Sequence, residues 1–390
     1  MISTSTGTSS SYIRLAQQAK KENRIPDAIS FYKKALSLDA SNVVAQQALG
    51  EIYFSQKDYQ LAKQRYTDAL KLNPDAPLTH FRLGRVEDIL GNWEDAVTYY
   101  KHSAYLNPKD FNPYQFLGEG YFFRKQLDEA KANYEKAIEL GSSVPWVRFK
   151  LGQIARQQKN ELAAIGYFQE AIRLNEKNPS FHQFLGEAYF AQQKYDLAKA
   201  SYQKAIELGT SAPWVRFKLG RVAQIQNNSE DAQLYFEKAI ALNPKNPQFH
   251  YFLGFLQAQQ SQIDDARASY EKALSLNPNH KPSQKGLEAL KKANAETLQS
   301  DDTTTIETLE VVDEKPEDAI FPTERVATQE LEQTDSNSTQ RQKATATSTT
   351  HDLHREQSVK YKIVPTEVES VEEEPHPNGF VEKIWQRLFG

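Results

Sequence analysis

Apolar residues follow a helical spacing along most of the chain. Within stretches of about a dozen residues they recur three or four positions apart, as in amphipathic helices. The pattern returns every 34 residues, with Gly followed twelve positions later by Ala and four positions further by Tyr or Phe. The recurring glycines are Gly50, Gly84, Gly118, Gly152, Gly186, Gly220 and Gly254, and Ala16 takes the first place. Eight such units cover residues 9–280, and each predicts a pair of helices.

The small and aromatic residues indicate how the two helices of a unit pack. Gly and Ala let two backbones approach closely, and the aromatic residue fills the space beside them on the same helical face. The letters LNP at 72–74, 106–108, 242–244 and 276–278 end the second helix, because Pro cannot continue it. Two units instead carry Gly141 and Gly209, expected as left-handed caps, before Pro145 and Pro213 in the first turn of the next helix.

The order Leu-Gly, Tyr, Ala, aromatic, Ala and Pro resembles the tetratricopeptide repeat family of bacterial type. That resemblance implies an all-α fold, a right-handed α-solenoid of antiparallel helix pairs whose stability comes from neighbouring units. We expect residues 1–8 to be disordered and residues 281–298 to form a capping helix. The eight repeats are residues 9–42, 43–76, 77–110, 111–144, 145–178, 179–212, 213–246 and 247–280.

A longer duplication lies within this array. Residues 111–178 and 179–246 are identical at 39 of 68 positions, so the duplicated unit is a pair of repeats. Each copy contains the letters PWVRFKLG, at 145–152 in the first and at 213–220 in the second. On a helix, Val147 and Leu151 face the partner helix, and Trp146 and Phe149 fall on the opposite side.

In the tetratricopeptide family, that opposite stripe lines a concave groove in which ligands lie. The resemblance therefore implies a groove in which aromatic and charged residues alternate. A partner segment with apolar side chains, or a sugar face, would stack on such a ladder. The groove candidates are Phe81, Arg85, Glu119, Phe122, Trp146, Phe149, Arg156, Glu187, Phe190, Trp214, Phe217, Arg221, Tyr251 and Phe255.

Structural interpretations of the same residues stay open. Trp146 and Trp214 either anchor a ligand or fill the seam between repeats. Arg85 with Glu119, and Glu187 with Arg221, either contact a partner or pair across neighbouring repeats. The Lys and Asn that clamp acidic chaperone C-termini in this family are missing from the corresponding groove positions.

The C-terminal quarter differs in charge and composition. Residues 1–296 carry a net charge of +7 and residues 297–390 one of −11, which gives −4 for the chain. We expect residues 299–378 to be a disordered acidic linker. Residues 379–390 predict an amphipathic helix that docks on another protein, folds back on the solenoid or lies on a membrane surface. Its apolar face comprises Phe380, Ile384, Trp385, Leu388 and Phe389.

Composition and motifs exclude several classes of function. The chain has no Cys, which removes disulfides and thiolate chemistry. No nucleotide-binding, zinc-hydrolase or serine-hydrolase motif occurs, and we expect no cofactor, no metal and no nucleic-acid partner. The prediction is a non-catalytic cytoplasmic scaffold or adaptor that binds a protein or peptide segment in the aromatic groove. The tail is expected to regulate access or to recruit a second partner, with membrane association only through the C-terminal helix. The alternative is an accessory module for a glycosyl- or sulfotransferase that acts in trans.

Overall fold

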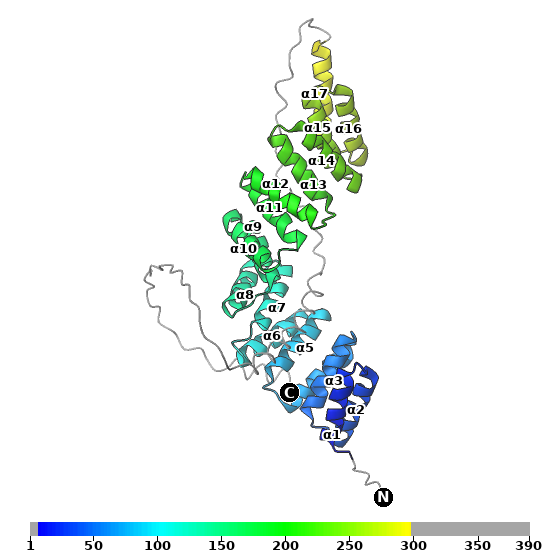
Figure 1. Ribbon diagram of the computed structural model, residues 1–390, viewed down its shortest axis with the longest axis vertical. Coiled ribbons are helices and arrows are strands. Elements are labelled where there is room, and N and C mark those ends of the chain that lie inside the picture. Colours follow the sequence, from blue (N-terminus) through cyan, green and yellow to red (C-terminus); the bar gives the residue numbers. More distant parts are fainter. Residues whose placement is uncertain (1–6, 298–390) are drawn as a thin grey trace, which may run out of the picture. The chain divides into compact units, whose positions relative to one another are not determined.

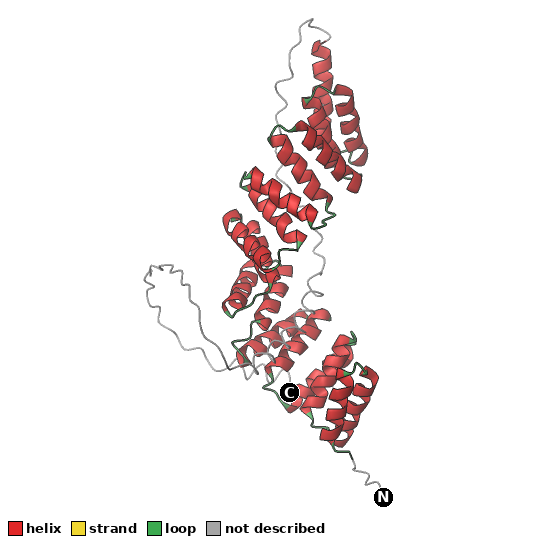
Figure 2. Ribbon diagram, viewed as in Figure 1, coloured by secondary structure: helices red, strands yellow, loops and turns green. Residues whose placement is uncertain are grey.

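The computed structural model describes residues 7–297, which form helices and no strands (Figures 1 and 2). One compact unit, residues 1–319, contains all the described helices, and the predicted acidic linker and C-terminal helix lie outside the described residues. The described helices are α1 (Ser9–Lys21), α2 (Ile25–Leu38), α3 (Val43–Ser55), α4 (Tyr59–Leu72), α5 (Pro77–Ile89), α6 (Trp93–Leu106), α7 (Asn112–Phe123), α8 (Leu127–Glu139), α9 (Pro145–Gln157), α10 (Glu161–Leu174), α11 (Pro179–Ala191), α12 (Tyr195–Glu207), α13 (Pro213–Ile225), α14 (Ser229–Leu242), α15 (Pro247–Gln259), α16 (Ile263–Leu276) and α17 (Lys281–Thr297).

Consecutive helices pair in the order that the repeats predict. Each odd-numbered helix from α1 to α15 packs most extensively against the even-numbered helix that follows it, and each pair then contacts the next. In Figure 1 these pairs follow one another in chain order from the blue α1 to the yellow α17. The all-α repeat fold is therefore confirmed.

The recurring Gly lies against the recurring aromatic ring of the same repeat. A methyl group added to Gly220 would come within 2.6 Å of the Phe236 ring, and one added to Gly118 within 2.7 Å of the Tyr134 ring. The alanines that accompany these rings are completely buried, among them Ala130. The close approach expected from the sequence is present within each helix pair that carries the recurring Gly.

The helix ends also agree with the sequence. Gly141 and Gly209 have φ values of 94° and 92°, in the left-handed region that suits Gly after a helix. Pro145 and Pro213 are the first residues of α9 and α13. The four helices followed by Asn-Pro end at the preceding Leu, as expected because Pro blocks continuation.

Helix α17 covers the last repeat. Leu290 is 2% exposed and joins a cluster with Phe255 and Tyr270, and Leu287 packs against the same cluster. Gly286 lets the Tyr270 ring approach, since a methyl group there would lie 2.7 Å from it. This helix buries the apolar face that the final repeat would otherwise expose.

Candidate functional site

The first helices of the repeats carry the predicted groove stripe, and most of its aromatic rings are buried. Phe149 is 2% exposed and Phe217 is 1% exposed. The sequence-based expectation that these two rings line an open groove is wrong for this structure. The other buried candidates are Phe81, Arg85, Phe122, Glu187 and Phe255, whereas Glu119, Arg156, Phe190, Arg221 and Tyr251 keep partial exposure.

The following repeat causes this burial. The Phe149 ring centroid lies 5.7 Å from Phe168 in its own repeat, and 5.1 and 5.0 Å from Phe181 and Phe184 on α11. Phe217 has the same environment one duplication later, with Phe236, Phe249 and Phe252 at 5.7, 5.1 and 5.1 Å. Both rings therefore hold consecutive repeats together.

Trp146 and Trp214 lie at the edge of these ring clusters and remain partly exposed. Trp146 lies 4.7 Å from Phe149 and 6.3 Å from Phe181. Trp214 lies 4.7 Å from Phe217 and 5.8 Å from Phe249. Each indole thus packs against the next repeat and still presents part of its surface to solvent.

A lysine accompanies each of these Trp side chains. Lys150 Nζ lies 5.0 Å from the Trp146 ring and 4.2 Å from the Phe122 ring, and Phe123 is 5.3 Å away and 38% exposed. We call Phe122, Trp146 and Lys150 the first aromatic–lysine cluster. The second aromatic–lysine cluster comprises Phe190, Trp214 and Lys218, with Lys218 Nζ 4.6 Å from Phe190 and 5.5 Å from Trp214.

Both lysines pair with aromatic faces, Lys150 in a buried setting and Lys218 in a partly exposed one. A cation over a ring gains about 0.5–2 kcal/mol, depending on how far both are removed from water. Burial lowers the pKa of Lys150, against an opposing effect of Glu119. Burial also lowers the pKa of Lys218 to about 8, and the arginines Arg221 and Arg156 add to the shift, whereas Glu187 opposes it.

Charged residues of the stripe link neighbouring repeats. Arg156 Nη1 lies 2.6 Å from Glu187 Oε2, and the Glu187 side chain is only 6% exposed. Glu119 accepts a hydrogen bond of 2.7 Å from the Tyr134 hydroxyl and lies 3.9 Å from Lys150 Nζ. Within the stripe, the short inter-repeat ion pair is therefore the one between Arg156 and Glu187. Sequence position suggested Arg221 as the partner of Glu187 and did not predict this pair.

Two arginines of the stripe stack on aromatic rings. The Arg85 guanidinium lies 4.9 Å from the Phe54 ring and 5.0 Å from the Phe116 ring. Arg221 lies 4.1 Å from the Phe252 ring. The basic and aromatic residues that alternate along the sequence therefore combine into stacked pairs, because rings of the neighbouring repeats reach across the seam.

Other candidate features of the described residues do not form a site of this kind. His182 and His250 bond through Nε2 to the carbonyls of Glu176 and Pro244, which gives them a structural role. In residues 7–297, no group of three or more His, Asp or Glu side chains is placed to hold a metal ion. None of the described helices is both long enough and apolar enough to cross a membrane.

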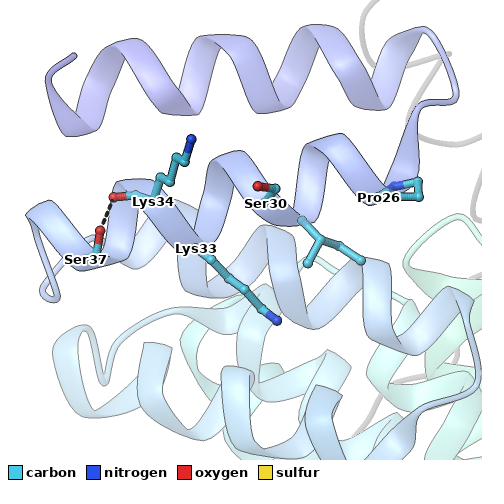
Figure 3. Close-up of a pocket in the computed structure, with 6 residues that line it drawn as sticks. Pro26, Ser30, Lys33, Lys34 and Ser37 are labelled. Atoms are coloured by element: carbon cyan, nitrogen blue, oxygen red, sulfur yellow. Dashed lines mark hydrogen bonds between the residues drawn. The ribbon is translucent and has the colours of Figure 1, made fainter. Parts of the chain in front are cut away.

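A surface hollow of about 480 Å³ runs along α2 (Figure 3). It is open to solvent, all its lining residues come from one helix, and none of them is buried. Figure 3 shows Lys33 and Lys34 extending from this helix in different directions. The lining residues are Pro26, Ile29, Ser30, Lys33, Lys34 and Ser37, and they bring together no convergent polar groups.

Comparisons with known proteins agree with this architecture. Tetratricopeptide repeat families match residues 9–42, 47–111, 117–180 and 217–281, and a further TPR repeat family matches residues 186–224. Superkiller complex protein 3 from Homo sapiens is 28% identical over 127 residues, which cover 30% of this chain and 8% of that protein. The small glutamine-rich tetratricopeptide repeat-containing protein 2 of Mycosarcoma maydis is 28% identical over 105 residues, or 27% of this chain and 30% of that protein.

A solved structure supports the fold. The C-terminal part of a TPR repeat-containing protein from Cytophaga hutchinsonii matches 62% of this chain and 99% of that chain, with a TM-score of 0.53 and 19% identity. The chain spans less than a third of the length of either curated relative. The repeat families together match more than half of the residues, and the chain therefore belongs to the tetratricopeptide repeat family.

Proposed function

We propose that this protein is a non-catalytic scaffold that binds an extended or helical segment of a partner protein along the first helices of its repeats. The observation that carries this proposal is the duplicated aromatic–lysine cluster, which offers a partly exposed Trp beside a lysine at two points of the array. Trp side chains at an interface contribute large contact areas and are common anchors of binding.

The relatives support a role in protein interaction. Human Superkiller complex protein 3 is named as part of a protein complex, and this chain is similar to 8% of its length. The repeat array also suits such a role, because a stack of helix pairs presents an extended surface without a single deep cavity. On this view the buried Phe149 and Phe217 support the surface from beneath, and direct contacts come from Trp146, Trp214 and the exposed Phe123.

Alanine variants of the full-length chain test the proposal. We expect the double variant Trp146→Ala/Trp214→Ala to lose bound partners in a pull-down followed by mass spectrometry, with affinity for an identified partner reduced about tenfold or more. Phe123→Ala gives a second probe with less effect on packing. The control is Leu162→Ala, because Leu162 is 67% exposed but lies on α10, a second helix.

Two results would count against the proposal. One is unchanged capture by the Trp and Phe123 variants, with circular dichroism showing that the repeats stay folded. The other is quenching of Trp fluorescence by oligosaccharides and not by the captured partner, which would favour the accessory role beside a sugar-transferring enzyme.

A further inference from the structure

The two aromatic–lysine clusters differ in whether a carboxylate lies close to the lysine. In the first cluster, Lys150 Nζ lies 3.9 Å from Glu119 Oε1. Glu187 stands at the equivalent position of the second copy, 68 residues later. Lys218, however, has no carboxylate within 4.0 Å and no hydrogen-bond acceptor among the described residues. One copy therefore has an internal counter-ion for its lysine, and the other lacks a close one.

Arg156 explains this difference. Its Nη1 lies 2.6 Å from Glu187 Oε2, and Gln183 Nε2 donates a 3.2 Å hydrogen bond to Glu187 Oε1. Both carboxylate oxygens are thus engaged by groups other than Lys218. The residue 68 positions before Arg156 is Asp88, in the repeat that precedes the duplicated pair, and it carries no cation to compete for Glu119. The charge at this position therefore differs between the two carboxylates, and so does the charge three residues after each lysine, where Gln153 corresponds to Arg221.

The surroundings of Lys218 leave room for an external acceptor. Its ammonium group lies against the faces of Phe190 and Trp214, which stabilise a cation but accept no strong hydrogen bond. Lys218 is partly exposed, so its ammonium is not sealed inside the repeats. Burial lowers the pKa of Lys218 to about 8 and Arg221 and Arg156 add to the shift, while Glu187 opposes it from beyond hydrogen-bond distance.

We propose that Lys218 binds the side-chain carboxylate of an Asp or Glu in the partner segment, next to an apolar residue that packs on Trp214. This inference rests on the proposed scaffold function and specifies the chemistry of its partner. A carboxylate at this position would supply the strong acceptor that the ring faces lack, in a partly buried setting where charge-assisted hydrogen bonds are stronger than in water. The first cluster, whose lysine has Glu119 close by, would bind apolar side chains without this preference.

Peptide selection on the full-length chain tests the inference. The probe is a library of random short peptides displayed with constant sequence at both ends, so that only side-chain carboxylates are offered. We expect the wild-type chain to enrich peptides with Asp or Glu at one fixed position beside an apolar residue. The same selection on Lys218→Met should lose the acidic position, whereas Lys150→Met and the charge-preserving Lys218→Arg should keep it.

Affinity measurements on one enriched peptide complete the test. Replacing its acidic residue by the corresponding amide, or using Lys218→Met, should each weaken binding about tenfold. The two changes together should weaken it no further, since they remove the same contact. Circular dichroism of each variant checks that the repeats remain folded.

The outcomes separate the inference from the function on which it rests. Enriched peptides without a fixed acidic position, or an acidic preference that survives in Lys218→Met, would overturn the role of Lys218 and leave the scaffold function standing. Selection of no peptide by the wild-type chain would overturn both. An acidic preference lost equally in Lys150→Met would contradict the distinction between the two clusters.

Discussion

Arg156 and Glu187 join the first helices of two consecutive repeats through a contact of 2.6 Å between Nη1 and Oε2. The carboxylate side is almost fully buried, and the arginine side chain is 27% exposed. This pair replaces the lysine–glutamate contact seen in the preceding copy of the duplication. One inter-repeat ion pair thus contributes both to the stacking of α9 on α11 and to the charge of the neighbouring cluster.

The contribution of this pair to stability can be measured by removing its cation. Arg156→Met leaves the Glu187 carboxylate buried without its closest partner, and we expect the free energy of unfolding to fall by about 2 kcal/mol. The double variant Arg156→Met/Glu187→Gln should recover part of that loss, because the Glu187 position is then neutral, although Glu161, 3.6 Å from Arg156, still loses its cation. Urea unfolding followed by circular dichroism gives both values, and equal losses in the two variants would contradict this account.

The Gly and aromatic contact within a repeat predicts a sharp difference between two Gly to Ala changes. Gly220→Ala places a methyl group within 2.6 Å of the Phe236 ring, and we expect a loss of about 1–3 kcal/mol. Gly166→Ala on α10 is the matched control, because a methyl group there meets no atom within 4 Å. That change should stabilise the chain by about 0.5–1 kcal/mol through helix propensity. Thermal unfolding of the two variants tests this difference, and similar stabilisation by both changes would show that the contact is unimportant.

Lys218 predicts a pH-dependent stability difference. Its pKa in the folded chain is about 8, below the ordinary value of 10.5, so the unfolded chain holds this proton more tightly. The cost of the charged Lys218 is fully present below pH 8 and disappears as the pH rises from about 8 to 10.5. Lys218→Met should therefore be more stable than wild type at pH 7, and this advantage should shrink over that range. Parallel urea titrations measure it, and an advantage independent of pH would contradict the assignment.

His80 predicts a loss of stability at acidic pH. Burial lowers its pKa to about 4, and His102, with ring centroid 4.2 Å away, adds to the shift. The hydrogen bond to the Pro74 carbonyl and the charge of Asp75 oppose it. Since the unfolded chain takes up this proton first, the free energy of unfolding should fall as the pH drops from about 6.5 to 4.

The variant His80→Gln isolates this effect. Gln keeps a polar group beside the Pro74 carbonyl and does not titrate, so the variant should lose less stability over that acidic range than wild type. The two proteins should show a constant difference above pH 7. A parallel decline of both between pH 6.5 and 4 would show that His80 does not cause the loss.

The sequence by itself determined the repeats and their internal packing. The spacing of Gly220 and Phe236 lies within one helix pair, where the geometry of two joined helices fixes which side chains meet. The caps at Gly141 and Gly209 are local in the same way, since backbone conformation and the following Pro determine them. These features depend on neighbours in the chain and were predicted correctly.

Only the tertiary structure decided what covers the stripe on the first helices. The helical period places Phe149 opposite Val147, but it contains no information about how closely the next repeat approaches. The rings of Phe181 and Phe184 fill that space and bury Phe149, and Arg156 reaches Glu187 across the same seam. The separation of stacked repeats depends on the side chains of both repeats. The helical period of one helix therefore predicts the side on which a residue lies, but it does not predict how exposed that residue is.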